Sequence, residues 1–231
     1  MPNTHSALNI VDITVQDEQL ELMGLNKDAI EQAIKDGLIQ FKRTTPLHPL
    51  THGGSTAWGE IVFALRGKLI TMSNEWSYYQ KGGLSITHNK ETGVALVVTS
   101  GDKETGLAHG QPSTKNKKGP STRSIVSCNQ TQDMFDEPVN NFENTITLPI
   151  DTTQTWVLLY HFDKAIKEIR FELSLPSSTA KISGKDDKLK IDSWKTRILF
   201  EPMPFDMNSN IEPMENITFS DDISFNVSKK A

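Results

Sequence analysis

Two segments near the N-terminus carry apolar side chains at the spacing of a helix. The first, residues 27–43, follows Asn26, a residue type that often caps a helix. The second, residues 56–71, follows Ser55 and has the stronger apolar stripe, which predicts a helix lying on a sheet. The residues between them, 45–54, are rich in proline, glycine and polar side chains and are typical of a linker.

Beyond residue 76 the apolar pattern changes to a period of two, which is typical of strands. Residues 84–88 alternate, and residues 94–99 (VALVVT) are almost continuously apolar, so we expect a hairpin whose second strand is central. A third helix is predicted from Pro120 to about residue 135, because proline favours the first helical position. Further strands or strand-like pieces are predicted at 144–150, 155–162, 166–175, 194–201, 217–219 and 223–227.

Three aromatic residues, Trp76, Tyr78 and Tyr79, lie beside Lys81 at the start of this region. We interpret them as an edge strand whose rings alternate between core and rim. Aromatic rings next to a cation also suit stacking with the bases of single-stranded nucleic acid, which is the alternative.

This order of elements predicts an α+β fold: a two-layer domain in which an antiparallel sheet carries two or three helices on one face. We expect residues 1–50 to form an N-terminal arm with one helix and the linker. Residues 51–204 would then be the core domain, and residues 205–231 a polar C-terminal tail or an appended hairpin.

The composition limits the classes of function. The 231 residues carry a net charge of −5, which argues against a protein that coats nucleic acid with its whole surface, so an anion site must be local. The one cysteine, Cys128, excludes an internal disulfide and a cysteine zinc site and fits a reducing compartment. No apolar run approaches the ~20 residues of a membrane helix, and the first ten residues lack the features of a secretory signal. We therefore expect a cytoplasmic protein with no membrane partner.

The stretch 101–119 is long for a connection without structure inside a compact domain, and loops of that length are often functional. It runs into the third helix, whose free amides and positive dipole end favour an anion. The candidate ligand-binding residues are Lys115, Lys117, Lys118, Ser121, Thr122 and Arg123. Their charges and hydroxyls suit the phosphate of a nucleotide or a nucleic acid, although the spacing is not that of a P-loop. The alternative is a solvated lysine loop before an ordinary helix.

Three carboxylates are candidate catalytic residues. Asp102 and Glu104 follow the central strand, and Glu172 lies on the polar face of a later strand, so together they could bind a divalent cation or act as a base. In the alternative, Asp102 and Glu104 stabilise a turn, and Glu168, Arg170 and Glu172 form an exposed ladder of charges. No histidine spacing of a metal site occurs, so we assign no metal-ligating residues, and the sequence identifies no cofactor.

Five segments of this chain resemble a set of uncharacterised bacterial proteins associated with phages, plasmids and other mobile elements. The segments are SGDKETG (100–106), KGPST (118–122), TWVLLY (155–160), FELSLP (171–176) and DSWKTRILFE (192–201). The resemblance covers roughly residues 58–201 and leaves out both ends. No activity is established for these proteins, so the resemblance implies a setting and assigns no catalytic residue.

Three functions are consistent with these features, and the sequence favours a binding module over an enzyme. The first is recognition of a phosphate-bearing ligand, a nucleic acid or a nucleotide, through the basic loop and the start of the third helix. The second is a metal-dependent nuclease or phosphodiesterase that uses the three carboxylates. The third is a protein-interaction or inhibitor protein of a mobile element, with a host protein as its partner.

Overall fold

The computed structural model describes residues 9–134, 154–181 and 188–205. These residues form four helices: α1 (Gln16–Leu22), α2 (Lys27–Lys42), α3 (His52–Met72) and α4 (Pro120–Met134). They also form eight strands: β1 (Asn9–Ile10), β2 (Trp76–Lys81), β3 (Leu84–Asn89), β4 (Val94–Ser100), β5 (Gln154–Asp163), β6 (Glu168–Lys181), β7 (Leu189–Leu199) and β8 (Met203–Pro204). The strands predicted at 144–150, 217–219 and 223–227 lie outside the described residues.

The strands make one mixed sheet in the order β1-β7-β6-β5-β4-β3-β2, with β8 added to β6. Most neighbours are antiparallel, but β4 and β5 run parallel, as do β1 and β7. The prediction of an antiparallel sheet was therefore wrong at its centre. Parallel neighbours need a long crossover, and the chain between β4 and β5 contains α4.

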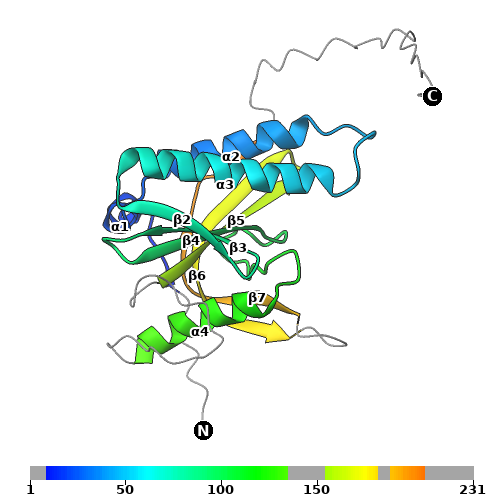
Figure 1. Ribbon diagram of the computed structural model, residues 1–231. Helices are drawn as coiled ribbons and strands as arrows, with labels where there is room; N and C mark the ends of the chain where they lie inside the picture. Colours follow the sequence, from blue (N-terminus) through cyan, green and yellow to red (C-terminus); the bar gives the residue numbers. More distant parts are fainter. Residues whose placement is uncertain (1–8, 135–153, 182–187, 206–231) are drawn as a thin grey trace, which may run out of the picture.

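Helices cover both faces of the sheet, which corrects the expectation of helices on one face. Figure 1 shows α2 and α3 side by side above the sheet and α4 below it. The reason lies in β4 and β5, whose successive side chains point to opposite faces. Leu96 and Leu158 belong to the core under α2 and α3, whereas Val97 and Leu159 pack in a second core that includes Ile125 of α4.

The N-terminal part contributes α1 and α2 to the main core, so it differs from the expected arm with one helix. Asn26 caps α2 by accepting a hydrogen bond from the Ala29 amide at 2.7 Å, as its residue type indicated. Gly37 lets α2 approach α3 closely, since a Cβ at this position would lie 2.3 Å from Cγ1 of Ile61. No helix among the described residues is long and apolar enough to span a bilayer.

Candidate functional site

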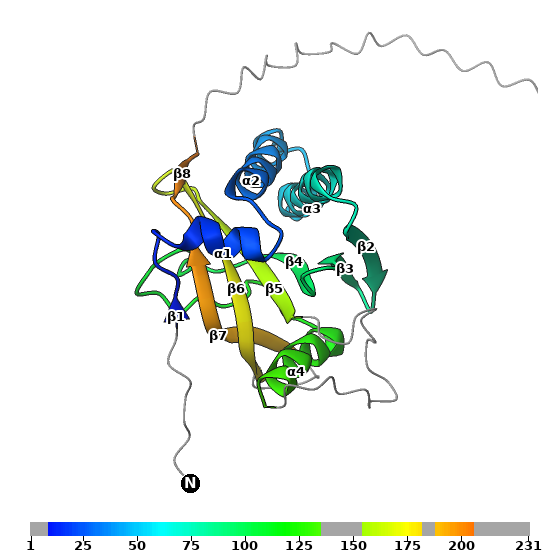
Figure 2. The same ribbon diagram turned by 90° about the vertical axis from the view of Figure 1, so that its left-hand side faces the viewer.

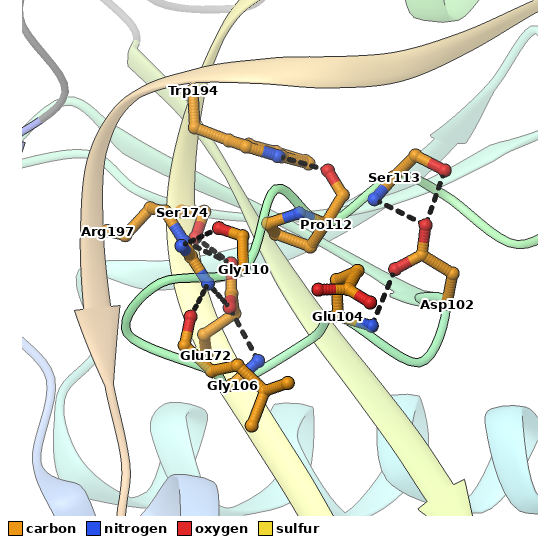
Figure 3. Close-up of polar contacts among 11 residues, drawn as sticks. Asp102, Glu104, Gly106, Gly110, Pro112, Ser113, Glu172, Ser174, Trp194 and Arg197 are labelled. Carbon is orange, nitrogen blue, oxygen red and sulfur yellow. Dashed lines mark hydrogen bonds and ion pairs between the residues drawn. The ribbon is translucent and has the colours of Figure 1, made fainter.

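The chain from residue 101 to residue 119 folds back over the sheet on the α4 side. α4 covers the apolar end of that face, and the loop covers the polar end, where β6 and β7 present Glu172, Ser174 and Arg197 (Figure 3). Trp194 of β7 lies between these two regions and donates a hydrogen bond from its indole to the Pro112 carbonyl at 2.7 Å. The loop is thus fixed to the strands beneath it.

Arg197 is the main anchor of this loop. Its guanidinium is fully buried and donates to the Gly110 carbonyl at 2.8 Å and to the Leu107 carbonyl at 3.1 Å. The same group binds the Glu172 carboxylate through Nε, at 3.0 Å, and through Nη2. A buried cation therefore has both its counterion and its hydrogen-bond acceptors, which is the condition under which burial of a charge is tolerated.

The Glu172 carboxylate accepts four hydrogen bonds, and all four come from other residues of the protein. Its carboxylate accepts hydrogen bonds from the Gly106 amide and from the Ser174 hydroxyl, each at 2.7 Å, in addition to those from Arg197. The carboxylate is fully buried, so neither a metal ion nor a substrate could reach it without breaking these bonds. Its contacts indicate a structural role.

The prediction that Glu168, Arg170 and Glu172 form an exposed ladder of charges was wrong, because Arg170 and Glu172 are buried beneath the loop. Arg170 reaches across to β5, where Nη2 lies 3.2 Å from the Asp163 carboxylate. The alternation of charged and apolar residues on β6 correctly separated the two faces. It could not indicate that a segment about seventy residues earlier would cover the charged one.

Asp102 organises the beginning of the loop. Its carboxylate accepts from the Glu104 amide at 3.1 Å, and from the Ser113 amide and hydroxyl at 3.0 and 2.7 Å (Figure 3). These bonds match the interpretation in which Asp102 stabilises a turn. Within the ranges that the structure describes, no group of three or more His, Cys, Asp or Glu side chains is placed to hold a metal ion.

The basic segment does not form one compact cluster. Lys115 and Lys117 are exposed, but the side chain of Lys118 turns inward and donates from its ammonium to the Thr99 hydroxyl of β4. Burial lowers the pKa of Lys118 to about 8. Among the described residues no carboxylate forms an ion pair with any of these three lysines.

α4 begins at Pro120, as its sequence predicted, and its first turn contacts the β2–β3 turn. The Ser121 hydroxyl donates to the Gly82 carbonyl at 2.8 Å, so its proton is directed at the scaffold. Thr122 is buried, and Arg123 is half-buried. Pro120 has no amide donor, and the Thr122 amide donates to the Gly119 carbonyl at 3.1 Å, so this helix end has fewer free main-chain donors than an ordinary helix start.

Two lysines that sequence reasoning did not select lie beside this segment. Lys118 and Leu189 form an antiparallel bridge, closed by hydrogen bonds in both directions at 2.8 and 3.2 Å. This register places Lys117 next to Lys190, with Lys188 one residue beyond the bridge. We call Lys115, Lys117, Lys118, Arg123, Lys188 and Lys190 the basic edge. The pairing is long-range, and no local pattern in the sequence indicated it.

Lys118 gives a pH-dependent test of this geometry. The fold lowers its pKa from 10.5 to about 8, so between these two pH values the unfolded chain binds more protons than the folded protein. The contribution of Lys118 to the free energy of unfolding should therefore rise as the pH increases from about 8 to 10.5. Lys118→Met should remove this rise, and it should increase stability at pH 7, where the folded protein holds a poorly solvated charge.

Urea titrations of both proteins at pH 7, 8.5 and 10 measure this effect. Other titrating groups are common to the two proteins and cancel in the difference. If the free energy of unfolding changes equally with pH in the wild type and in Lys118→Met, the Lys118 ammonium is well solvated and the expected effect is absent.

Comparison of the chain with family models, with curated proteins and with solved structures found no match.

Proposed function

We propose that this protein binds nucleic acid through phosphate contacts at the basic edge, and that it is a binding module and not an enzyme. The observation that carries the proposal is the bridge between Lys118 and Leu189. It brings lysines from two distant segments together beside the start of α4. Like charges placed side by side repel each other, and a bound polyanion would relieve that repulsion.

The surroundings of the basic edge support an anionic ligand. The described residues supply no carboxylate within ion-pair distance of its six cations. The first turn of α4 adds the positive end of the helix dipole, although its Thr122 amide already donates to the Gly119 carbonyl at 3.1 Å. Lys118, half-buried without a counterion, has a charge that a phosphate oxygen would stabilise.

The layout favours a phosphate backbone over a single nucleotide. Lys117 and Lys188 lie beside the bridge on two neighbouring segments, and Lys115 lies in a bend just before it. All three are exposed, so their ammonium groups are spread along a surface. A nucleotide site usually encloses its ligand, whereas contacts to a nucleic-acid backbone are made on open surfaces. The sequence-independent nature of such contacts predicts little preference among sequences.

Fluorescence anisotropy with labelled strands of about 20 nucleotides tests the proposal. Single-stranded DNA, duplex DNA and single-stranded RNA are titrated at 50 and 200 mM salt. With about four phosphate contacts, the affinity should fall on the order of 10²-fold between the two salt concentrations. Unlabelled ATP that competes at micromolar concentration would instead assign the site to a nucleotide. The absence of salt-sensitive binding to all three probes would contradict the proposal.

The carboxylates that could have supported a nuclease do not favour that function. Glu172 accepts four hydrogen bonds from the loop, β6 and β7, and Asp102 accepts three from the loop. A base or metal ligand needs a free lone pair directed at the substrate.

A further inference from the structure

Among the described strands, β2 is the last one at one edge of the sheet. It pairs with β3 on one side, and no strand of the described ranges pairs with its other side. At the opposite end of the sheet the last strand is β1, which has only two residues and pairs with β7 (Figure 2). An uncovered edge strand of six residues presents main-chain donors and acceptors that another strand can use.

The hairpin register shows which main-chain groups of β2 point outward. Gly82 and Gly83 form a two-residue turn with φ of 57° and 77°, and the pair that closes such a turn, Lys81 and Leu84, is hydrogen-bonded. Hydrogen-bonded pairs then recur at every second residue along β2. The amide and carbonyl of Tyr78 therefore point away from β3, as do those of Gln80.

Trp76 has the same outward orientation, but its amide is already used. That amide donates to the Ser73 carbonyl at 3.3 Å, which leaves the Trp76 carbonyl as the outward acceptor.

An apolar groove of about 410 Å³ runs beside this edge, between α3 and the β2–β3 hairpin. Phe63 of α3 is 71% exposed and Tyr78 is 59% exposed, both unusual for large rings on a surface. The Arg66 guanidinium lies over the Tyr78 ring, 4.8 Å from its centroid, and both residues line the groove.

Charged residues lie at both ends of β2: Glu75 directly precedes the strand, and Lys81 is its last residue. Glu75 and Lys81 form no ion pair with any residue that the structure describes. Five residues of β2 lie between them and keep the two side chains roughly 20 Å apart, so they cannot pair with each other in one molecule. An antiparallel copy of the same strand would place each of them opposite the other.

We propose that the β2 edge pairs with β2 of a second copy of this chain, in an antiparallel register centred on Tyr78. The Tyr78 amide and carbonyl then bond those of the partner's Tyr78, and the Gln80 amide donates to the carbonyl of the partner's Trp76. Glu75 faces the partner's Lys81 at both ends of the interface. The two Tyr78 rings meet beside the grooves and cover apolar surface that the single chain leaves exposed.

This register is set by the main chain and by charge together. Outward groups occur at every second residue, so only registers that pair even-numbered residues with even-numbered residues form hydrogen bonds. The register centred on Tyr78 has the longest overlap of these, since it uses every outward-facing residue of β2, from Trp76 to Gln80. It is also the one that pairs Glu75 with the opposite charge.

Sedimentation velocity of the full chain over a range of concentrations tests the proposal. We expect a concentration-dependent species with twice the 25.8 kDa chain mass. Lys81→Glu places two carboxylates opposite each other at both ends of the interface and should weaken dimerisation by at least about tenfold. The double variant Glu75→Lys/Lys81→Glu restores opposite charges and should dimerise again.

Tyr78→Pro is a second, independent variant. It removes an amide that β3 does not use, a position where an edge strand tolerates proline. This variant should be monomeric, with near-wild-type far-UV circular dichroism. A wild-type chain that stays monomeric at about 200 μM would overturn the proposal, as would a dimer that neither Lys81→Glu nor Tyr78→Pro weakens.

Discussion

Replacing Arg197 with leucine is expected to lower the free energy of unfolding by about 3–5 kcal/mol. The substitution leaves the buried carboxylate of Glu172 without its counterion and removes the donors that serve the Leu107 and Gly110 carbonyls. Because these carbonyls lie in the loop, the loop should also lose hydrogen bonds to β7 and become more mobile. Urea unfolding at pH 7, with hydrogen exchange of residues 101–119, measures both effects.

A double-mutant cycle separates the ion pair from the general cost of altering a buried site. Glu172→Met combined with Arg197→Leu removes both charges, so its cost should be less than the sum of the two single costs by more than 1 kcal/mol. Arg43→Leu is the matched control, since Arg43 is exposed and should change stability by less than about 0.5 kcal/mol. Additive costs for Glu172 and Arg197 would show that the pair does not act as a unit.

The combined variant Lys117→Ala/Lys118→Met/Lys190→Ala is expected to weaken nucleic-acid binding on the order of 10²-fold at 50 mM salt. Each substitution removes one cation from the bridge region, where the proposed phosphate contacts are concentrated. Stability should not fall, since Lys117 is exposed and Lys118 is a half-buried charge. Anisotropy titrations give the affinity, and thermal unfolding checks the fold.

The matched control removes three lysines from the α2–α3 side of the sheet: Lys27→Ala/Lys35→Ala/Lys68→Ala. It changes the net charge by the same amount, so any effect of overall charge appears in both proteins. Equal losses of affinity in the two variants would mean that the basic edge is not the site of contact.

Much of the local structure was predictable because its causes are local. The N-cap at Asn26 and the proline at the first position of α4 set helix starts at the residues where they are observed. The alternation of residues 84–88 and the apolar run of residues 94–99 predicted a hairpin, and the antiparallel pairing of β3 with β4 confirms it.

The assignment of helices to faces was not predictable from the sequence. The sequence of β4 is VALVVTS, and its first five residues are apolar at both odd and even positions. This pattern indicates burial on both sides of the sheet but not which helix covers which side. The parallel pairing of β4 with β5 depends on the path of the crossover through α4, a long-range property.

The features of the candidate site also fall into two groups: those that the sequence predicted and those that it could not. The sequence indicated that the loop and the start of α4 carry cations, because charge and helix boundaries are local features. It could not indicate that Lys118 turns inward or that Lys190 lies beside Lys117. Nor could it indicate that the Glu172 carboxylate is paired with the Arg197 guanidinium. Each of these depends on contacts between segments far apart in the chain.

The salt dependence of the binding constant tests the proposed phosphate contacts most directly. The slope of log K against log salt counts the phosphates that are neutralised, at about 0.7 per contact for single strands and 0.9 for duplex DNA. The magnitude of the slope should decrease by the value of about one phosphate contact for Lys117→Ala. It should decrease by the same amount again when Lys190→Ala is added. A slope identical to that of the wild type in both variants, or a wild-type slope near zero, would contradict the account.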